Sequence, residues 1–372
     1  MNILYISHSS LATGSESVLI STINGIEKKD IDNQYLVIPY SKTNNFSKQI
    51  TKGRILKQYI LPFKSIGNKT VKSICCLIYN LYSILFICSI IKKKNIGLVY
   101  VNTSANIAGA VAAWISGRKV VWHIHEQPNR NTSVIPSSFQ FLYRAMFLNN
   151  RFKMVFTSRK ALAGWEEELN CKIENYTIIN PPTKEIVGYT KHQADIFTYG
   201  YIGTLVESKN LITLIECFEK IVRYSEKKTR LIIFGSGPLL SEIQETVKQL
   251  DISQYVEIKD FNSDVSSFYS SIDVLVQPSY NESWGMVIIE AISLQIPAII
   301  TKESGVADIL TDNTECLLID PCSKTELFEK MKLILEDQPL RESIGRNAYR
   351  KYKEMNLTNS FKNSVYKIIY DK

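Results

Sequence analysis

The chain has 372 residues, of which 45% are hydrophobic and 22% are charged, as expected of a globular protein with about two domains. These proportions exclude a disordered chain, a collagen-like rod and a polytopic membrane protein. Seven cysteines without a C-x-x-C pair and only four histidines argue against a zinc site or a disulfide framework, and indicate a reducing cytosol. The first ten residues, MNILYISHSS, predict a buried strand rather than a signal peptide.

Positive charge is concentrated in the first half of the chain. Residues 1–185 carry 23 Lys and Arg against 10 Asp and Glu, whereas residues 186–372 carry 21 against 26. No acidic residue stands between Asp32 and Glu126, a stretch that contains 13 basic residues. This asymmetry indicates an anionic partner for the first half, with a membrane surface, a phosphorylated lipid and a nucleic acid as the candidates.

Apolar runs alternate with amphipathic segments, the pattern of a parallel sheet covered by helices. In the first half, the expected strands are Ile3–Ser7, Gln34–Pro39, Leu98–Asn102, Val120–His123 and Met154–Thr157, and the expected helices are Ser17–Gly25, Ala105–Ser116 and Arg159–Leu169. The uncharged segment Ile74–Ile91 is 18 residues long and precedes three lysines, so it is a marginal transmembrane candidate. Because a span would divide the sheet, we expect a packed or surface-lying helix there, still able to touch a membrane in its interfacial plane.

The pattern restarts after Asn180-Pro181-Pro182. The expected strands are Phe197–Ile202, Leu231–Phe234, Val256–Ile258, Val274–Val276 and Ala298–Thr301, and the expected helices are Leu211–Ser225, Leu239–Leu250, one that begins near Trp284, and about Asn359–Ile369. The chain is therefore expected to form two doubly wound α/β domains, residues 1–185 and 186–355. The last helix, about residues 356–372, is expected to cross back onto the first domain.

Two glutamates flank a predicted helix start in the motif Glu282-Ser-Trp-Gly-Met-Val-Ile-Ile-Glu290. The amides of Trp284, Gly285 and Met286 would be helix-start donors without intrahelical partners, which suits a phosphate. Gly285 would let a ligand approach the backbone closely. Taken alone, the spacing of the two glutamates is better explained by an acidic helix cap and a solvated glutamate.

The residues around this motif resemble those of a known family. The segments Gly203-Thr-Leu-Val-Glu-Ser-Lys209-Asn210, Phe234-Gly-Ser-Gly-Pro238, Asp273 through Ala291, Pro297-Ala-Ile-Ile and Gly305-Val-Ala-Asp308 resemble, in order and spacing, the donor-binding domain of retaining glycosyltransferases of family four. The first half agrees more loosely, through Gly14-Ser-Glu16 and Val121-Trp-His-Ile-His125-Glu126. The resemblance implies the GT-B fold, in which two Rossmann-like, doubly wound domains face a central cleft. The first domain would bind the acceptor and the second the nucleotide sugar.

The resemblance also implies roles for the matching residues. Glu290 would accept both ribose hydroxyls, Lys209 would neutralise the pyrophosphate, and Glu282 would hold a sugar hydroxyl. His125 would lie beside the sugar, so His125 and Glu282 are the expected catalytic residues, whereas His123 is expected to face the core. The other donor-binding residues would be Gly14, Ser15, Gly203, Thr204, Gly235, Trp284, Gly285, Met286 and Val287.

The sequence departs from the family pattern at three positions. Thr204 stands where the family often has an arginine that binds the phosphate together with the lysine. The loss of this arginine weakens anion binding unless Lys302 or a residue of the first domain compensates. Ser15 replaces the second glycine of its loop. Gln295 replaces a common glycine before Pro297.

Neither a metal nor a dinucleotide cofactor is expected. Asp30-Ile-Asp32 has the Asp-x-Asp form of the metal motif of the other glycosyltransferase fold, GT-A, but its place between the first helix and the second strand predicts a solvated turn. Gly235-Ser-Gly237 lacks the acidic ribose residue of a dinucleotide fingerprint. The expected donor is a substrate, a nucleotide-diphosphate sugar of the UDP or GDP type.

The leading hypothesis is a retaining, metal-independent glycosyltransferase that modifies a lipid-linked or oligosaccharide acceptor in bacterial capsule, O-antigen or exopolysaccharide synthesis. Retention would need either front-face attack by the acceptor or a nucleophile that the sequence does not identify. The alternative is a catalytically impaired nucleotide- or carbohydrate-binding relic of the same fold. A nucleic-acid-binding protein is disfavoured because no recognition motif is present. The basic half is instead expected to meet an anionic membrane from the cytoplasmic side.

Overall fold

The computed structural model describes residues 1–10, 14–26, 31–41, 46–62, 70–128, 134–135, 137–191, 195–260 and 265–370, with the side chains of residues 70–79 left out. The chain forms two compact units. Unit 1 consists of Met1–Pro182 and Leu357–Lys372, and unit 2 consists of Thr183–Asn356. The residues outside the described ranges include Asp30 of the Asp-x-Asp motif, whereas Asp32 is exposed and accepts a hydrogen bond from the terminal amine at 2.8 Å.

Unit 1 is built on a seven-stranded parallel sheet with the strand order β3-β2-β1-β4-β5-β6-β7. Its strands are β1 (Asn2–Ile6), β2 (Gln34–Pro39), β3 (Lys57–Leu61), β4 (Ile96–Asn102), β5 (Lys119–Ile124), β6 (Phe152–Phe156) and β7 (Tyr176–Ile178). Its helices are α1 (Gly14–Gly25), α2 (Thr70–Lys93), α3 (Ile107–Ile115), α4 (Gln140–Phe147), α5 (Arg159–Leu169) and α12 (Leu357–Tyr370).

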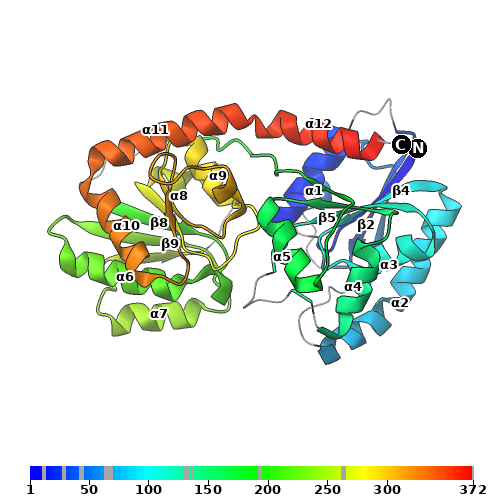
Figure 1. Ribbon diagram of the computed structural model, residues 1–372, viewed down its shortest axis with the longest axis horizontal. Helices are drawn as coiled ribbons and strands as arrows, with labels where there is room; N and C mark the ends of the chain where they lie inside the picture. The colour runs from blue at the N-terminus through cyan, green and yellow to red at the C-terminus, as the bar shows by residue number, and fades with distance from the viewer. Residues whose placement is uncertain are drawn as a thin grey trace. The chain divides into compact units, whose positions relative to one another are not determined.

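The two faces of the unit 1 sheet carry separate cores (Figure 1). Helices α2, α3, α4 and α5 cover one face, whereas α1 and α12 cover the other. From α12, Phe361, Val365 and Ile369 are buried among side chains of α1 and of the central strands. The last helix of the chain therefore completes the core of unit 1.

Unit 2 is built on a six-stranded parallel sheet with the strand order β10-β9-β8-β11-β12-β13. Its strands are β8 (Phe197–Ile202), β9 (Thr229–Phe234), β10 (Val256–Lys259), β11 (Val274–Gln277), β12 (Ala298–Thr301) and β13 (Leu317–Ile319). Its helices are α6 (Leu211–Tyr224), α7 (Leu240–Gln249), α8 (Ser266–Ser270), α9 (Met286–Ser293), α10 (Lys324–Glu336) and α11 (Gln338–Met355). Helices α6, α7 and α10 pack on one face of this sheet, and α8 and α9 lie on the other.

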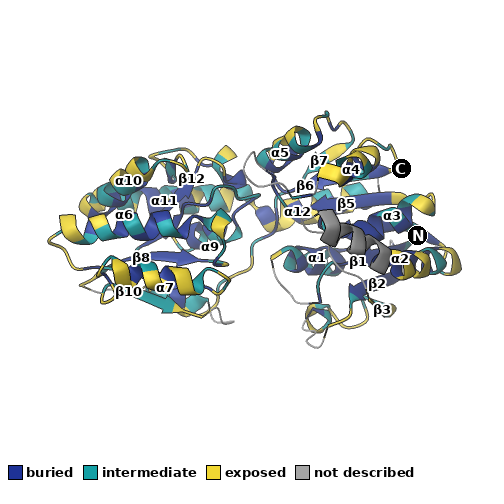
Figure 2. Cartoon of the chain, turned by 90° about the horizontal axis from the view of Figure 1, so that it is seen from below, coloured by how far each residue is buried: buried dark blue, intermediate teal, exposed yellow. Residues whose placement is uncertain are grey.

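The central strands of both sheets are almost wholly buried, and the helices alternate between buried and exposed faces (Figure 2). Strands β3, β7 and β10 are partly exposed. Several helix starts differ by a few residues from the sequence expectation, among them α3 at Ile107 rather than Ala105 and α12 at Leu357 rather than about Asn359. The first helix begins at Gly14 rather than near Ser17, and α9 begins at Met286 rather than near Trp284, because Gly285 takes a positive φ of 102° before the helix. Among the described residues, no helix is long and apolar enough to cross a membrane.

Candidate functional site

In each sheet the strand order reverses between two neighbouring strands, β1 and β4 in unit 1 and β8 and β11 in unit 2. Doubly wound folds bind ligands outside the carboxyl ends of the strands at such a reversal. The loops that follow these four strands, with the loop after β5, contain most of the residues expected from the sequence. Each unit therefore places its candidate residues at the edge where this topology favours a ligand.

Two loops of unit 2 meet closely after β8 and β9. Gly203 has a φ of 152°, and its amide donates to the carbonyl of Phe234 at 3.0 Å. A Cβ on Gly235 would lie only 1.9 Å from the carbonyl oxygen of Gly203. The close packing of the two loops thus explains why residue 235 is a glycine. Thr204 is exposed, and its carbonyl accepts a hydrogen bond from the Tyr201 hydroxyl at 2.9 Å.

Lys209 and Glu282 form an ion pair, with side chains 20% and 22% exposed. The loop after β8 and the loop after β11 are tied together beside them, since the amide of Tyr280 donates to the carbonyl of Ser208 at 2.9 Å. An ammonium group has three N–H donors, so Lys209 can keep this contact and still donate to a phosphate oxygen. Lys302, the cation expected to compensate for Thr204, instead lies 3.6 Å from the Glu326 carboxylate.

The start of α9 offers free backbone donors. Within the described part of the chain, the amides of Met286 and Val287 have no protein hydrogen-bond partner. Gly285 precedes them, and a Cβ there would lie 2.7 Å from Ile288. Trp284 is buried, its carbonyl accepts from the amide of Val306 at 3.0 Å, and its Nε1 has no partner among the described residues. The helix start can therefore accept an anion at its backbone.

Glu290 lies one turn into α9 and contacts a residue that the sequence analysis did not identify. The hydroxyl of Tyr269, in α8, donates to Glu290 Oε2 at 2.7 Å. Burial raises the pKa of Glu290, and the hydrogen bond from Tyr269 only partly offsets this. Tyr269 thus fixes the carboxylate while leaving other acceptor sites of its two oxygens for hydroxyl donors.

In unit 1, His125 belongs to a buried polar network after β1, β4 and β5. Its Nε2 lies 3.0 Å from Oδ1 of Asn102, whose Nδ2 donates to Oε1 of Glu16 at 3.3 Å. Burial, together with His123, lowers the pKa of His125 well below its ordinary value. The ring is therefore neutral at pH 7 and can act as a hydrogen-bond partner but not as a cation.

Two further histidines lie close to this network. His8 Nδ1 lies 2.8 Å from Glu16 Oε1; burial lowers the pKa of His8, but the hydrogen bond and charge of Glu16 outweigh this and raise it. His123 is buried as expected, within 2.7 Å of the Tyr100 hydroxyl, and burial lowers its pKa to about 3.

The two remaining expected residues, Gly14 and Ser15, begin α1, the helix that follows β1. Gly14 has open space where a Cβ would stand, whereas the Ser15 hydroxyl donates to Glu16 Oε2 at 2.9 Å. The Ser15 side chain thus takes part in the hydrogen-bond network around Glu16. A glycine at this position would instead leave the backbone accessible to a ligand. Asn102 and His8 were not identified as site residues from the sequence, although His8 lies six residues before the Gly14-Ser-Glu16 segment.

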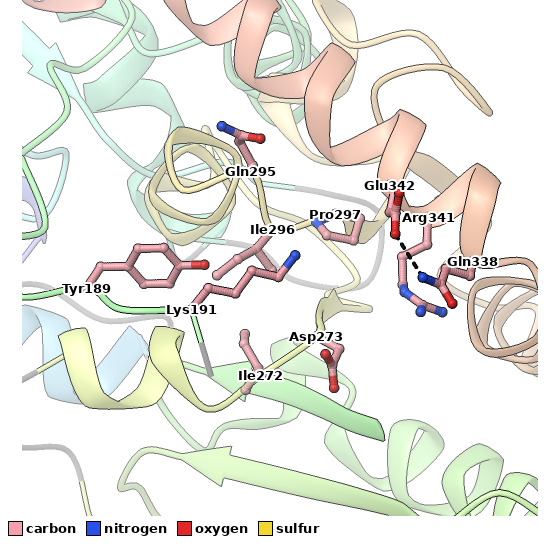
Figure 3. A pocket seen from close by; sticks show the side chains of 10 residues that line it. All are labelled: Tyr189, Lys191, Ile272, Asp273, Gln295, Ile296, Pro297, Gln338, Arg341 and Glu342. Carbon is pink, nitrogen blue, oxygen red and sulfur yellow. Dashed lines mark hydrogen bonds between the residues drawn. The ribbon is translucent and has the colours of Figure 1, made fainter. Parts of the chain in front are cut away.

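A separate pocket of about 310 Å³ lies at the opposite edge of the unit 2 sheet (Figure 3). Asp273 and Pro297, which line it, directly precede β11 and β12, so this pocket opens at the amino ends of the strands. Lys191, Arg341 and Glu342 give it mixed charge. None of the expected site residues lines it. In the described part of the chain, no group of His, Cys, Asp and Glu is arranged to hold a metal ion.

Comparison with known proteins finds a family match in the second half of the chain. Residues 185–351 match the family described as glycosyl transferases group 1. This segment is therefore similar to a glycosyl transferases group 1 domain. It coincides with nearly all of unit 2 and contains the Lys209–Glu282 pair, the start of α9 and Glu290.

Relatives of the chain include the capsular polysaccharide biosynthesis glycosyltransferase CapM of Staphylococcus aureus, 29% identical over 50% of this chain and 49% of CapM. A Campylobacter jejuni α-1,4-N-acetyl-D-galactosaminyltransferase that acts on a GalNAc-GalNAc-diNAcBac-PP-undecaprenol is 25% identical over 42% of this chain and 44% of its own. The chain thus aligns with less than half of the length of these two relatives.

The fold of the whole chain matches a solved structure. Anabaena Alr3699/HepE, in complex with UDP and glucose, aligns over 100% of both chains with a TM-score of 0.79 and 18% identity. The protein has the GT-B fold of two Rossmann-like α/β domains, as the sequence predicted.

Proposed function

We propose that the protein is a retaining, metal-independent glycosyltransferase that moves a sugar from a nucleotide-diphosphate sugar to a lipid-linked or oligosaccharide acceptor in bacterial surface-polysaccharide synthesis. The observation that carries the proposal is the grouping in unit 2 of a lysine, an open helix start and a fixed carboxylate at the switch point of the sheet. CapM is named as a glycosyltransferase of capsular polysaccharide biosynthesis, the Campylobacter jejuni relative is named for an undecaprenol-linked acceptor, and Anabaena Alr3699/HepE was solved with UDP and glucose. These names support the general class of the proposed reaction.

Each residue of this group matches one part of a nucleotide sugar. Glu290 accepts the ribose hydroxyls, and the amides of Met286 and Val287 donate to a phosphate oxygen. Lys209 neutralises charge that grows on the diphosphate as the bond to the sugar breaks. Glu282 orients the lysine and accepts a sugar hydroxyl.

The Lys209–Glu282 ion pair favours front-face attack over a covalent intermediate, because a carboxylate paired with an ammonium is a poor nucleophile. In this reaction the acceptor oxygen bonds to the anomeric carbon while the bond from that carbon to the phosphate oxygen breaks. The bonding pair goes to the phosphate, which also takes the acceptor's proton. No protein nucleophile is then required.

A thermal-shift panel of UDP, GDP, ADP, CMP and dTDP tests the proposal. A ligand at 100 times its dissociation constant should stabilise the protein by about 2.7 kcal/mol. A shift for one nucleotide that is lost in Glu290→Ala would fix the base and support the site. Absence of any shift at millimolar nucleotide would contradict the proposal and favour a non-catalytic relic of the fold.

The basic first unit is proposed to rest on the anionic inner face of the plasma membrane, where a lipid-linked acceptor would lie. Helix α2 exposes Leu81, Tyr82, Leu85 and Phe86, between 37% and 62% each, and ends in lysines. Vesicles containing phosphatidylglycerol, but not phosphatidylcholine alone, should sediment the protein. Leu85→Ser should weaken binding, while Phe141→Ser, on the exposed face of α4, is the matched control.

A further inference from the structure

A fully buried carboxylate organises the polar network of unit 1. Glu16 is 0% exposed. Around it lie the Ser7 hydroxyl at 3.1 Å, the Ser15 hydroxyl at 2.9 Å and His8 Nδ1 at 2.8 Å, in addition to Asn102. A buried ionised carboxylate is tolerated only when it is paired and hydrogen-bonded, and His8 with the two serines meets that condition. Ionised Glu16 can only accept hydrogen bonds.

The carboxylate dictates how the Asn102 side chain is turned. The amide nitrogen of Asn102 lies 3.3 Å from Glu16 Oε1 and 3.4 Å from the carbonyl oxygen of Ser15. Both neighbours are acceptors, so the amide must present its NH₂ group to them. Its oxygen must then face the opposite way, toward His125.

The orientation of Asn102 in turn fixes the tautomer of His125. The amide oxygen of Asn102 lies 3.0 Å from His125 Nε2, and a carbonyl oxygen can only accept. Nε2 must therefore carry the proton of the imidazole. In the neutral ring the other nitrogen, Nδ1, is then an acceptor.

The ring is also held in place from the backbone side. The carboxylate of Glu126 accepts from the amide of His125 at 3.1 Å and from the amide of Ser104 at 3.0 Å. This ties the chain after β5 to the chain after β4, which carries Asn102. The position and the proton of His125 are thus set by two different carboxylates.

We propose that Glu16 is a positioning residue that, through Asn102, fixes His125 as the Nε2–H tautomer and so makes its Nδ1 an acceptor for a substrate hydroxyl. The proposal rests on the proposed glycosyl transfer, because the hydroxyl is taken to belong to the saccharide. An Nδ1 acceptor suits a sugar hydroxyl and repels a phosphate oxygen. Glu16 itself touches no substrate.

Histidine tautomers are read directly from long-range ¹⁵N–¹H spectra, and the chain has only four histidines to assign. Wild-type protein should show His125 as a single Nε2–H tautomer. Glu16→Gln should mix the tautomers, because a glutamine can present either a donor or an acceptor to Asn102, and only the 3.4 Å contact with the Ser15 carbonyl then still favours the original orientation. It should also lower kcat about tenfold, the worth of one hydrogen bond, with the donor KM nearly unchanged. Glu174→Gln, at an exposed carboxylate of unit 1, should change neither quantity.

A second variant separates tautomer control from general loss of structure. It combines Glu16→Gln with Asn102→Asp, so that the introduced glutamine donates to the introduced aspartate. The carboxylate of that aspartate then accepts from His125 Nε2–H. The Nε2–H tautomer should return although Glu16 is absent.

Three results would overturn the proposal: an Nδ1–H tautomer in the wild type, an unchanged single tautomer in a folded Glu16→Gln variant, or mixed tautomers with full kcat. Failure of the proposed function is a different result. In that case His125 would still be the Nε2–H tautomer in the wild type, but the protein would neither bind nor turn over a nucleotide sugar. The proposed binding of a saccharide hydroxyl by His125 would then be overturned together with the proposed function.

Discussion

Replacing Glu290 by glutamine tests donor binding in unit 2 with the least structural disturbance. The Tyr269 hydroxyl occupies one acceptor site of the carboxylate at 2.7 Å, and glutamine keeps the volume and one acceptor oxygen. It loses the charge and one acceptor for the ribose hydroxyls. A hydrogen bond to a charged group contributes about 1.5–3 kcal/mol, so losing one should weaken nucleotide binding about 10- to 150-fold.

Isothermal titration with the nucleotide that gives the thermal shift is the assay. Glu242→Gln, at an exposed position of α7, is the matched control and should bind like the wild type. Tyr269→Phe should weaken binding less than Glu290→Gln, because it removes only the group that holds the carboxylate. A folded Glu290→Gln protein with a dissociation constant within about twofold of the wild type would refute the assigned role of Glu290.

Three further changes test other parts of the structure. Glu282→Ala should lower kcat at least about tenfold while changing the donor KM less, measured by initial rates; equal small effects on both would count against its role. Gly235→Ala should lower the free energy of unfolding of unit 2 by about 1–3 kcal/mol in urea, because its Cβ would lie 1.9 Å from a carbonyl oxygen. Gly14→Ala is the control, since a Cβ at Gly14 would meet only open space. Since Glu16 raises the pKa of His8, their pairing stabilises the fold fully below about pH 6.5 and is lost as pH rises through the folded-state pKa. His8→Gln should therefore lower Tm more at pH 5.5 than at pH 9, and an equal loss at both would argue against the pairing.

The main architecture could be predicted because buried parallel strands leave continuous apolar runs in the sequence, as in LVYVN after residue 97 and VVWH after residue 119. The strands missed by this reasoning were short and lay at or near the edges of the sheets. Strand β3, with the sequence KQYIL, is half exposed, and β7 has three residues. Such segments are strands because a neighbour pairs with them, which local composition does not reveal.

The candidate site shows a similar division. The motif around Glu282 and Glu290 was visible because its residues are close in sequence. The contact between Tyr269 and Glu290, and the relay from Glu16 to Asn102, join segments 21 and 86 residues apart. These partners become neighbours only when parallel strands align their carboxyl ends, and no spacing rule in a single sequence specifies which side chains then meet.

The place of α12 has a consequence for how the protein is made. Its side chains fill the core of unit 1, yet the ribosome must first synthesise all 174 residues of unit 2, Thr183–Asn356. At about 5–20 residues per second, this delay lasts on the order of ten to thirty seconds. Throughout that interval the apolar side chains of α1 have no α12 to cover them. Unit 2, which is continuous in sequence, can fold before unit 1 is complete, so the order of folding is expected to run opposite to the order of synthesis.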